Sequence, residues 1–210
     1  MPAMLIVHFI SLIARYTKRI LRENTTREYY NAKKVYEGGL TLTLHRLYRL
    51  GEELVANANS RDPFQIADEI GLQIQMVKDF TVLKGVYMIL HEVPWAFIND
   101  NLDDRMKRIV CAHEIGHHLL HQDLVRQTML QEFSLFDRKN RPEYEANVIA
   151  AEILLPDTEV LEMIYDCGYD AFQIARCTGS DVNLVALKCD ILVEKGYDLH
   201  RIDHQSDFLR

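Results

Sequence analysis

The stretch His113-Glu114-Ile115-Gly116-His117 decides how the centre of this chain is expected to fold and what it is expected to bind. On a helix with 3.6 residues per turn, His113 and His117 lie one above the other, about 6 Å apart along the axis, so both imidazoles can reach one Zn²⁺ ion. Glu114 projects beside them, where a carboxylate can take a proton from water and pass it to a leaving amine. The stretch therefore predicts a helical zinc site with hydrolytic chemistry, with Glu114 as its general base.

The surrounding residues favour the helix that this prediction needs. Asn101-Leu102-Asp103-Asp104 provides an N-cap and acidic residues for a first turn, and apolar residues follow at helical spacing as far as Leu120. Between residues 109 and 121 the chain has no proline, and its one residue of the Asp, Glu, Lys and Arg types is Glu114. Because a lone buried carboxylate is costly, a metal ion or water is expected beside it.

The third metal ligand does not come from the same helix. The extended pattern H-E-x-x-H-x-x-G-x-x-H would need glycine at 120 and histidine at 123, where this chain has Leu120 and Asp123. His121 lies about 12 Å along the helix axis from His113 and cannot reach the same ion. We expect His118 and His121 to be ordinary, partly exposed histidines, with His118 as a candidate proton shuttle.

A second helix is predicted over residues 141–156, a segment that begins and ends near a proline. Glu143 and Asn147 are four residues apart on it, so a ligating carboxylate and an amide that holds the far nitrogen of a ligand imidazole would share one face. Glu145 is the alternative ligand and lies roughly 200° round the helix from Glu143. Glu143 is favoured because Asn147 then lies on its face.

These two segments together resemble a known family. HEIGHHLLH at 113–121, followed by PEYEANVIAAEILLPD at 142–157, is similar to the ImmA/IrrE family of metallo-endopeptidases. The second segment follows the family pattern E-x-x-A-N/D-x-F-A-A-x-L-L-M-P, with the apolar replacements Ile149 for phenylalanine and Leu155 for methionine. The resemblance covers roughly residues 43–160. It implies a gluzincin-like zinc endopeptidase that cleaves a helix-turn-helix repressor and so derepresses genes of a phage, another mobile element or a stress response.

The sequence predicts an α+β fold, with a small, mostly antiparallel sheet packed against zincin-like metal-binding helices and followed by a C-terminal helical cap. The expected regions are an N-terminal extension (1–42), a metallopeptidase domain (43–160) and the cap (161–210). The elements expected before the metal helices are a helix with a leucine stripe at 44–54, a helix at 63–69 closed by Gly71, and strands near 72–76, 86–90 and 95–98. An edge of that sheet could receive a substrate peptide as an added strand.

The sequence predicts the structure and role of two segments less clearly. Residues 122–142 lack periodicity and suit a lid or specificity loop, in which Phe133, Leu135 and Phe136 are candidate substrate contacts, although core packing is favoured for them. For the extension at 1–42, the alternatives are an amphipathic helix packed on the domain or a partner, a peripheral membrane anchor, and sequence absent from the natural product. The favoured alternative is the packed helix, and attachment to a membrane is not expected.

Composition favours a cytoplasmic enzyme. The chain carries 24 Lys and Arg against 31 Asp and Glu, a formal net charge of −7. Residues 1–50 hold nine basic and three acidic residues, and the remainder holds fifteen and twenty-eight. The catalytic part is therefore acidic, which argues against nucleic-acid binding. The four cysteines have no C-x-x-C spacing and are expected to be reduced thiols in or near the core, with Cys111 facing away from the metal.

Two other function classes stay open at this point. The helices near 170–177 and 182–195 resemble a helix-turn-helix, but residues 181–195 hold two lysines against three acidic residues, a poor composition for a recognition helix. A proteolytically silent metal-binding regulator would keep the three ligands and be indifferent to loss of Glu114. For the peptidase, Tyr87, Tyr144 and His118 are candidates for stabilising the oxyanion.

Overall fold

The computed structural model describes residues 40–127, 130–132 and 141–199. The chain divides into two units, Met1–Arg46 and Leu47–Arg210. Nearly all of the first unit lies outside the described residues, and so do Phe133, Leu135 and Phe136. The hypotheses about the N-terminal extension and about these three side chains therefore remain predictions.

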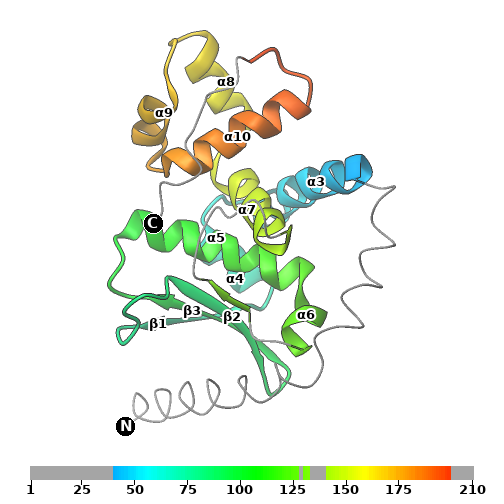
Figure 1. Ribbon diagram of the computed structural model, residues 1–210, viewed down its shortest axis with the longest axis vertical. Coiled ribbons are helices and arrows are strands. Elements are labelled where there is room, and N and C mark those ends of the chain that lie inside the picture. Colours follow the sequence, from blue (N-terminus) through cyan, green and yellow to red (C-terminus); the bar gives the residue numbers. More distant parts are fainter. Residues whose placement is uncertain (1–39, 128–129, 133–140, 200–210) are drawn as a thin grey trace. The chain divides into compact units, whose positions relative to one another are not determined.

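The elements are α3 (Leu40–Ala58), α4 (Pro63–Glu69), β1 (Gln73–Val77), β2 (Gly85–Leu90), β3 (Val93–Asn99), α5 (Asp104–Leu120), α6 (Gln122–Gln127), β4 (Leu130–Glu132), α7 (Arg141–Leu154), α8 (Asp157–Tyr165), α9 (Ala171–Thr178) and α10 (Val182–Glu194). The strands β1, β2 and β3 precede helix α5 as the sequence predicts, whereas a short helix and a fourth strand that were not predicted lie between α5 and α7 (Figure 1).

The sheet has the strand order β1-β3-β2-β4. Strands β1 and β3 run parallel, whereas β2 pairs antiparallel with both β3 and β4. The predicted α+β class with a small, mostly antiparallel sheet is confirmed. The β2–β3 hairpin is tighter than predicted, because Val93 and Pro94 belong to β3 and the turn is His91-Glu92 alone. Both turn residues have positive φ, 50° and 64°, the geometry that matches a two-residue turn to the twist of its strands.

The connection between α5 and α7, which lacks periodicity and was expected to be a lid or specificity loop, contains regular secondary structure. It contains the short helix α6 and the strand β4, which pairs with Gly85–Tyr87 of β2. A three-residue strand has too few residues to show an alternating pattern, and its pairing partner lies more than forty residues earlier in the chain. Strand β4 therefore forms one edge of the sheet and β1 the other.

Helix α5 lies at the centre of the Leu47–Arg210 unit, packed against β2 and β3 on one side and against α7 on another (Figure 1). Its residues from Ile109 to His118 are all buried. Helix α7 is buried on the side that faces α5 and also contacts α10. The two helices that carry the candidate ligands are thus interior elements packed against each other.

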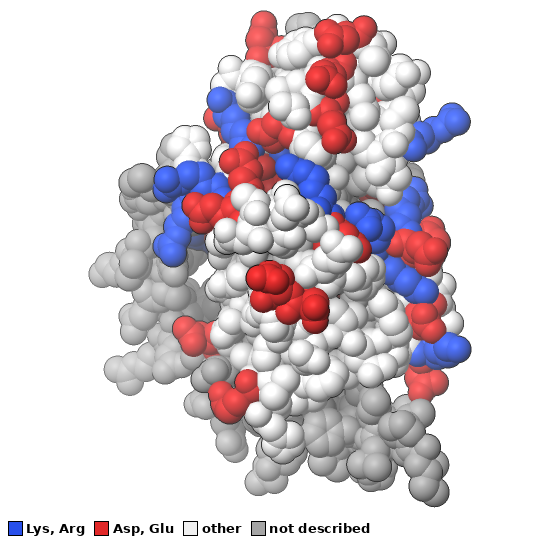
Figure 2. All heavy atoms as spheres, turned by 180° about the vertical axis from the view of Figure 1, so that it is seen from behind, with Lys and Arg blue, Asp and Glu red and all other residues white. Residues whose placement is uncertain are grey.

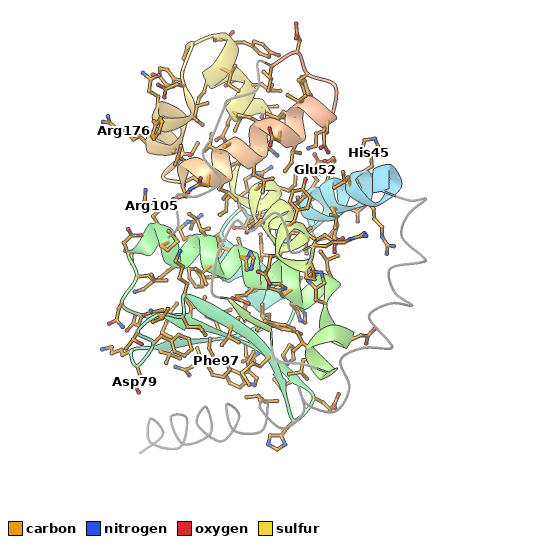
Figure 3. All side chains as sticks on the ribbon, viewed as in Figure 1. His45, Glu52, Asp79, Phe97, Arg105 and Arg176 are labelled. Carbon is orange, nitrogen blue, oxygen red and sulfur yellow. The ribbon has the colours of Figure 1, made fainter. Side chains whose placement is uncertain are left out.

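Helix α10, the candidate recognition helix of the C-terminal cap, is largely buried. Six consecutive residues of α10, Leu184 to Cys189, are buried, and so are Ile191 and Leu192. Even Lys188 is 0% exposed. The exposed Arg176 extends from the preceding helix α9, away from α10 (Figure 3). In Figure 2, basic side chains on the face seen from behind lie among acidic ones. A recognition helix must be exposed, so this geometry argues against the helix-turn-helix hypothesis.

Within the described residues, no helix is both long and apolar enough to span a bilayer. The four cysteines are free, as predicted, but Cys167 and Cys177 are exposed while Cys111 and Cys189 are buried. Burial raises the pKa of the Cys111 thiol above its ordinary range. A protonated interior thiol has no nucleophilic role, so Cys111 is a packing residue.

Candidate metal centre

The first two candidate ligands are presented by α5. The helix begins at the N-cap Asp103, whose Oδ1 accepts a hydrogen bond from the backbone N–H of Met106 at 2.7 Å. Ten residues further on, His113 and Glu114 are both 0% exposed, and His117 is 2% exposed. Three polar side chains with this degree of burial need partners within the protein or a ligand.

The third candidate ligand comes from the first turn of α7. Arg61 fixes the other end of this helix, because its Nη1 donates to the carbonyl oxygens of Glu152 at 2.8 Å and Ile153 at 3.0 Å. Glu143 is buried at the opposite end, 7% exposed. The anchoring of α7 therefore determines where the Glu143 carboxylate meets α5.

One atom from each candidate ligand meets the other two. Nε2 of His113 lies 2.9 Å from Nε2 of His117 and 3.2 Å from Oε2 of Glu143, and the remaining side of the triangle is 3.5 Å. Tetrahedral ligands held about 2.0–2.1 Å from a zinc ion would stand ~3.3 Å apart. A linear hydrogen-bonded chain would not close into such a triangle. The two imidazoles and one carboxylate therefore fit the donor set of a zinc ion.

The far nitrogen of each imidazole is also held. Nδ1 of His113 lies 2.8 Å from Oδ1 of Asn147, and Nδ1 of His117 lies 3.1 Å from Nδ1 of His121. Hydrogen bonds at this position fix the ring orientation of metal-binding histidines. The rival carboxylate, Glu145, is directed elsewhere, with its Oε2 3.1 Å from Nε2 of His121.

The Glu114 carboxylate occupies space that a glycine leaves open. A Cβ atom on Gly85 of β2 would lie 2.5 Å from Oε1 of Glu114. Two residues along the same strand, the hydroxyl of the fully buried Tyr87 is 3.0 Å from Nδ1 of His118. Of the three oxyanion candidates, Tyr87 and His118 are thus bound to each other, and Tyr144 is half-buried on α7.

The shifted pKa values of His117 and Glu143 give the centre the protonation states that a metal requires. Burial lowers the pKa of His117 to about 4, helped by the neighbouring His113. Burial alone would raise the pKa of Glu143, but hydrogen bonds from His113 and His117 outweigh it and hold this pKa well below its usual range. Near neutral pH the centre therefore combines a neutral imidazole with an ionised carboxylate, the forms that donate electron pairs to a metal.

The predicted exposure of two histidines was wrong. His118 and His121 were expected to be partly exposed, but they are only 8% and 7% exposed. The reason is tertiary, because Tyr87 of the sheet and Glu145 of α7 cover them. Sequence reasoning also missed the role of Gly85 and the contact of His121 with His117. The spacing of these two histidines, four residues apart, was the available signal for that contact.

The comparisons with known proteins agree with this geometry on the class of protein. The family that matches is one of metallopeptidases. The family model Peptidase_M78, described as the IrrE N-terminal-like domain, matches residues 75–189, and the chain belongs to this family. A relative from Bacillus phage phi105, named uncharacterized immunity region protein 2, is 28% identical over 137 residues, which cover 65% of this chain and 85% of the relative.

Proposed function

We propose that this protein is a zinc-dependent endopeptidase of the two-His, one-Glu type, with His113, His117 and Glu143 as metal ligands. The observation that carries the proposal is the closed triangle of Nε2, Nε2 and Oε2 atoms, each side between 2.9 and 3.5 Å. A bound Zn²⁺ would supply Lewis acid chemistry, which polarises a scissile carbonyl and lowers the pKa of water toward about 7.

Glu114 is the general base in this proposal. Its carboxylate is on the residue next to His113, is fully buried and lies against Gly85 of the sheet. It accepts a proton from the water molecule whose oxygen attacks the peptide carbonyl carbon. It then transfers that proton to the amide nitrogen as the C–N bond breaks, so the products are a carboxylic acid, which keeps the second proton of the water until it ionises, and an amine.

The proposed substrate is a helix-turn-helix repressor, whose cleavage would derepress the genes of a phage or another mobile element. Two observations support it. The chain belongs to the IrrE-like family, and its relative is named for a phage immunity region. Helix α10 is too buried to read DNA, so it is not proposed as the recognition helix of this repressor. Free cysteines suit the reducing cytoplasm, where such a repressor would be found.

The test combines metal analysis with cleavage. Wild type, Glu114→Gln and Glu143→Gln would be purified, analysed for zinc by mass spectrometry, and incubated with repressors encoded in the same genomic region, with and without a chelator. We expect about one zinc per chain in wild type and in Glu114→Gln, zinc lost from Glu143→Gln, and cleavage by wild type alone.

The other outcomes separate the alternatives. Zinc in wild type together with equal biological activity of wild type and Glu114→Gln would identify a silent regulator instead of a peptidase. Zinc retained in Glu143→Gln but lost in Glu145→Gln would identify Glu145, instead of Glu143, as the third ligand. A wild-type protein that binds no zinc would overturn the proposed function altogether.

A further inference from the structure

A third histidine lies behind the candidate ligand His117. His121 is the C-cap residue of α5, a position usually open to solvent, yet it is 7% exposed. Its Nδ1 is 3.1 Å from Nδ1 of His117, and its Nε2 is 3.1 Å from Oε2 of Glu145. The second oxygen of Glu145 accepts a hydrogen bond from Nε of Arg141 at 2.6 Å. These four residues form one chain, the His117–Arg141 relay, which joins the end of α5 to the start of α7.

The direction of each hydrogen bond in this relay follows from the position of His117. Nε2 of His117 is its vertex of the triangle with His113 and Glu143. If Nε2 donates its lone pair to a metal, the single proton of the neutral ring must be on Nδ1. That N–H donates to Nδ1 of His121, so the proton of His121 must be on Nε2. The Nε2–H group of His121 donates to Oε2 of the Glu145 carboxylate. The other oxygen of this carboxylate accepts a hydrogen bond from the Arg141 guanidinium.

The two candidate ligand histidines are therefore held by different groups. An amide oxygen, from Asn147, accepts the hydrogen bond of His113. For His117 the acceptor is an imidazole whose own proton is bound by a carboxylate. A carboxylate at the end of such a chain makes the ligand nitrogen more basic and keeps the ring in one orientation.

We infer that His121 and Glu145 are positioning residues, which hold His117 in its Nδ1–H form and so raise the affinity of the centre for zinc. The inference rests on the proposed function, because it assumes that His117 is a metal ligand. It also explains why two carboxylates two positions apart on α7 face different partners. Glu143 completes the triangle, and Glu145 accepts the end of the relay.

The test measures zinc affinity by titrating metal-free protein against a chromophoric chelator. His121→Gln keeps the relay, since its side-chain oxygen can accept from His117 and its NH₂ group can donate to Glu145. His121→Leu removes both functions at a similar volume. We expect His121→Leu to bind zinc roughly 10–100-fold more weakly than wild type, and His121→Gln to restore most of that loss. Glu145→Gln, which keeps the shape but loses the charge, should weaken binding about tenfold.

A spectroscopic measurement separates positioning from general stability. In zinc-loaded wild type, long-range proton–nitrogen NMR spectra should show His117 protonated at Nδ1 and His121 protonated at Nε2. His91→Asn is the matched control for the zinc titration. His91 is an exposed histidine in the β2–β3 turn, so this variant should bind zinc as tightly as wild type. Thermal unfolding of the metal-free proteins checks that each variant is folded.

The outcomes distinguish this inference from the proposed function. Unchanged zinc affinity in folded His121→Leu, or a His121→Gln variant as weak as His121→Leu, would overturn the relay and leave the zinc site intact. Nε2 protonation of His117 in the zinc-loaded protein would overturn it as well. A wild type without zinc binding would overturn both proposals.

Discussion

Gly116 lies directly against Ala146, at the place where α5 crosses α7. A Cβ atom on Gly116 would be 2.6 Å from the Cα and 3.0 Å from the Cβ of Ala146. Non-bonded carbon atoms do not approach so closely, so a side chain at this position would push the two helices apart. Only glycine permits the observed separation of α5 and α7. Because Gly116 stands next to His117, and Ala146 is three residues from Glu143, the close approach also brings the candidate ligands within reach of each other.

Gly116→Ala should therefore weaken both folding and metal binding. We expect a loss of about 1–3 kcal/mol in the free energy of unfolding from overpacking, although alanine is the better helix former by about 1 kcal/mol. Zinc affinity should fall too, because α7 must move away. Urea unfolding of the metal-free protein and a chelator titration measure the two effects. A variant stabilised by its higher helix propensity, with unchanged zinc affinity, would show that the helices are not in tight contact.

Gly85→Ala should instead separate catalysis from metal binding. The added methyl group would meet Oε1 of Glu114 and Cγ1 of Val110, each at 2.5 Å. None of its three nearest atoms belongs to a candidate metal ligand. We expect zinc content near that of wild type and a fall in kcat of about tenfold or more, because the displaced carboxylate can no longer meet its water.

The control for Gly85→Ala is the same change in a Glu114→Ala background. There the carboxylate is gone, and the methyl group has only Val110 to displace. The cost of Gly85→Ala in the free energy of unfolding should be smaller than in wild type, and the difference measures the contact. Equal losses of unfolding free energy in the two backgrounds would mean that the Glu114 carboxylate does not contact Gly85 of β2.

Local signals made much of this fold predictable. Helix α4 was predicted to its last residue, and the N-cap of α5 lay within the four residues expected to provide it. These features depend on contacts between neighbours in the chain. In contrast, β4 and the parallel pairing of β1 with β3 depend on partners twenty or more residues away. Local pattern contains no information about them.

The same distinction applies to the centre. Helical spacing was enough to put His113 and His117 on one face and to exclude His121 as a partner of His113 at the same ion. It could not show that Glu145 reaches back to His121, because that contact depends on how α7 is shifted along α5. Nor could it show that Gly85 leaves room for Glu114. Both require the packing of separate elements.

A buried charge network joins α7 to the cap and should dominate the stability of that junction. Nζ of the fully buried Lys188 is 3.0 Å from Oε1 of Glu152 and 2.5 Å from Oδ1 of Asp157. Lys195 is bound to the same two carboxylates and approaches Glu52 of α3 at 3.6 Å. Lys188→Met would leave two carboxylates with one lysine, and should cost ~3–5 kcal/mol in the free energy of unfolding.

The control for Lys188→Met is Lys78→Met, at a lysine whose side chain is 82% exposed and which stands 3.9 Å from Asp100. An exposed ion pair contributes little, so this change should stay within about 0.5 kcal/mol of wild type in urea unfolding. Should Lys188→Met prove as mild as Lys78→Met, the network would be replaceable by apolar packing.

The network also predicts how stability depends on pH. Burial alone would raise the pKa of Asp157, but hydrogen bonds and charge from Lys188 and Lys195 outweigh it and lower the pKa below its ordinary range. A carboxyl group with a lower pKa in the folded state stabilises that state above its unfolded pKa of about 3.9, and the stabilisation is lost as pH falls through the folded pKa. Asp157→Asn should therefore reduce stability at pH 7 and flatten its decline below about pH 4. Urea unfolding of metal-free protein across this range measures the slope of unfolding free energy against pH.

The control is Asp166→Asn, at the exposed end of α8, which should keep the wild-type slope. An Asp157→Asn variant with that same slope would assign the acid sensitivity to other carboxylates.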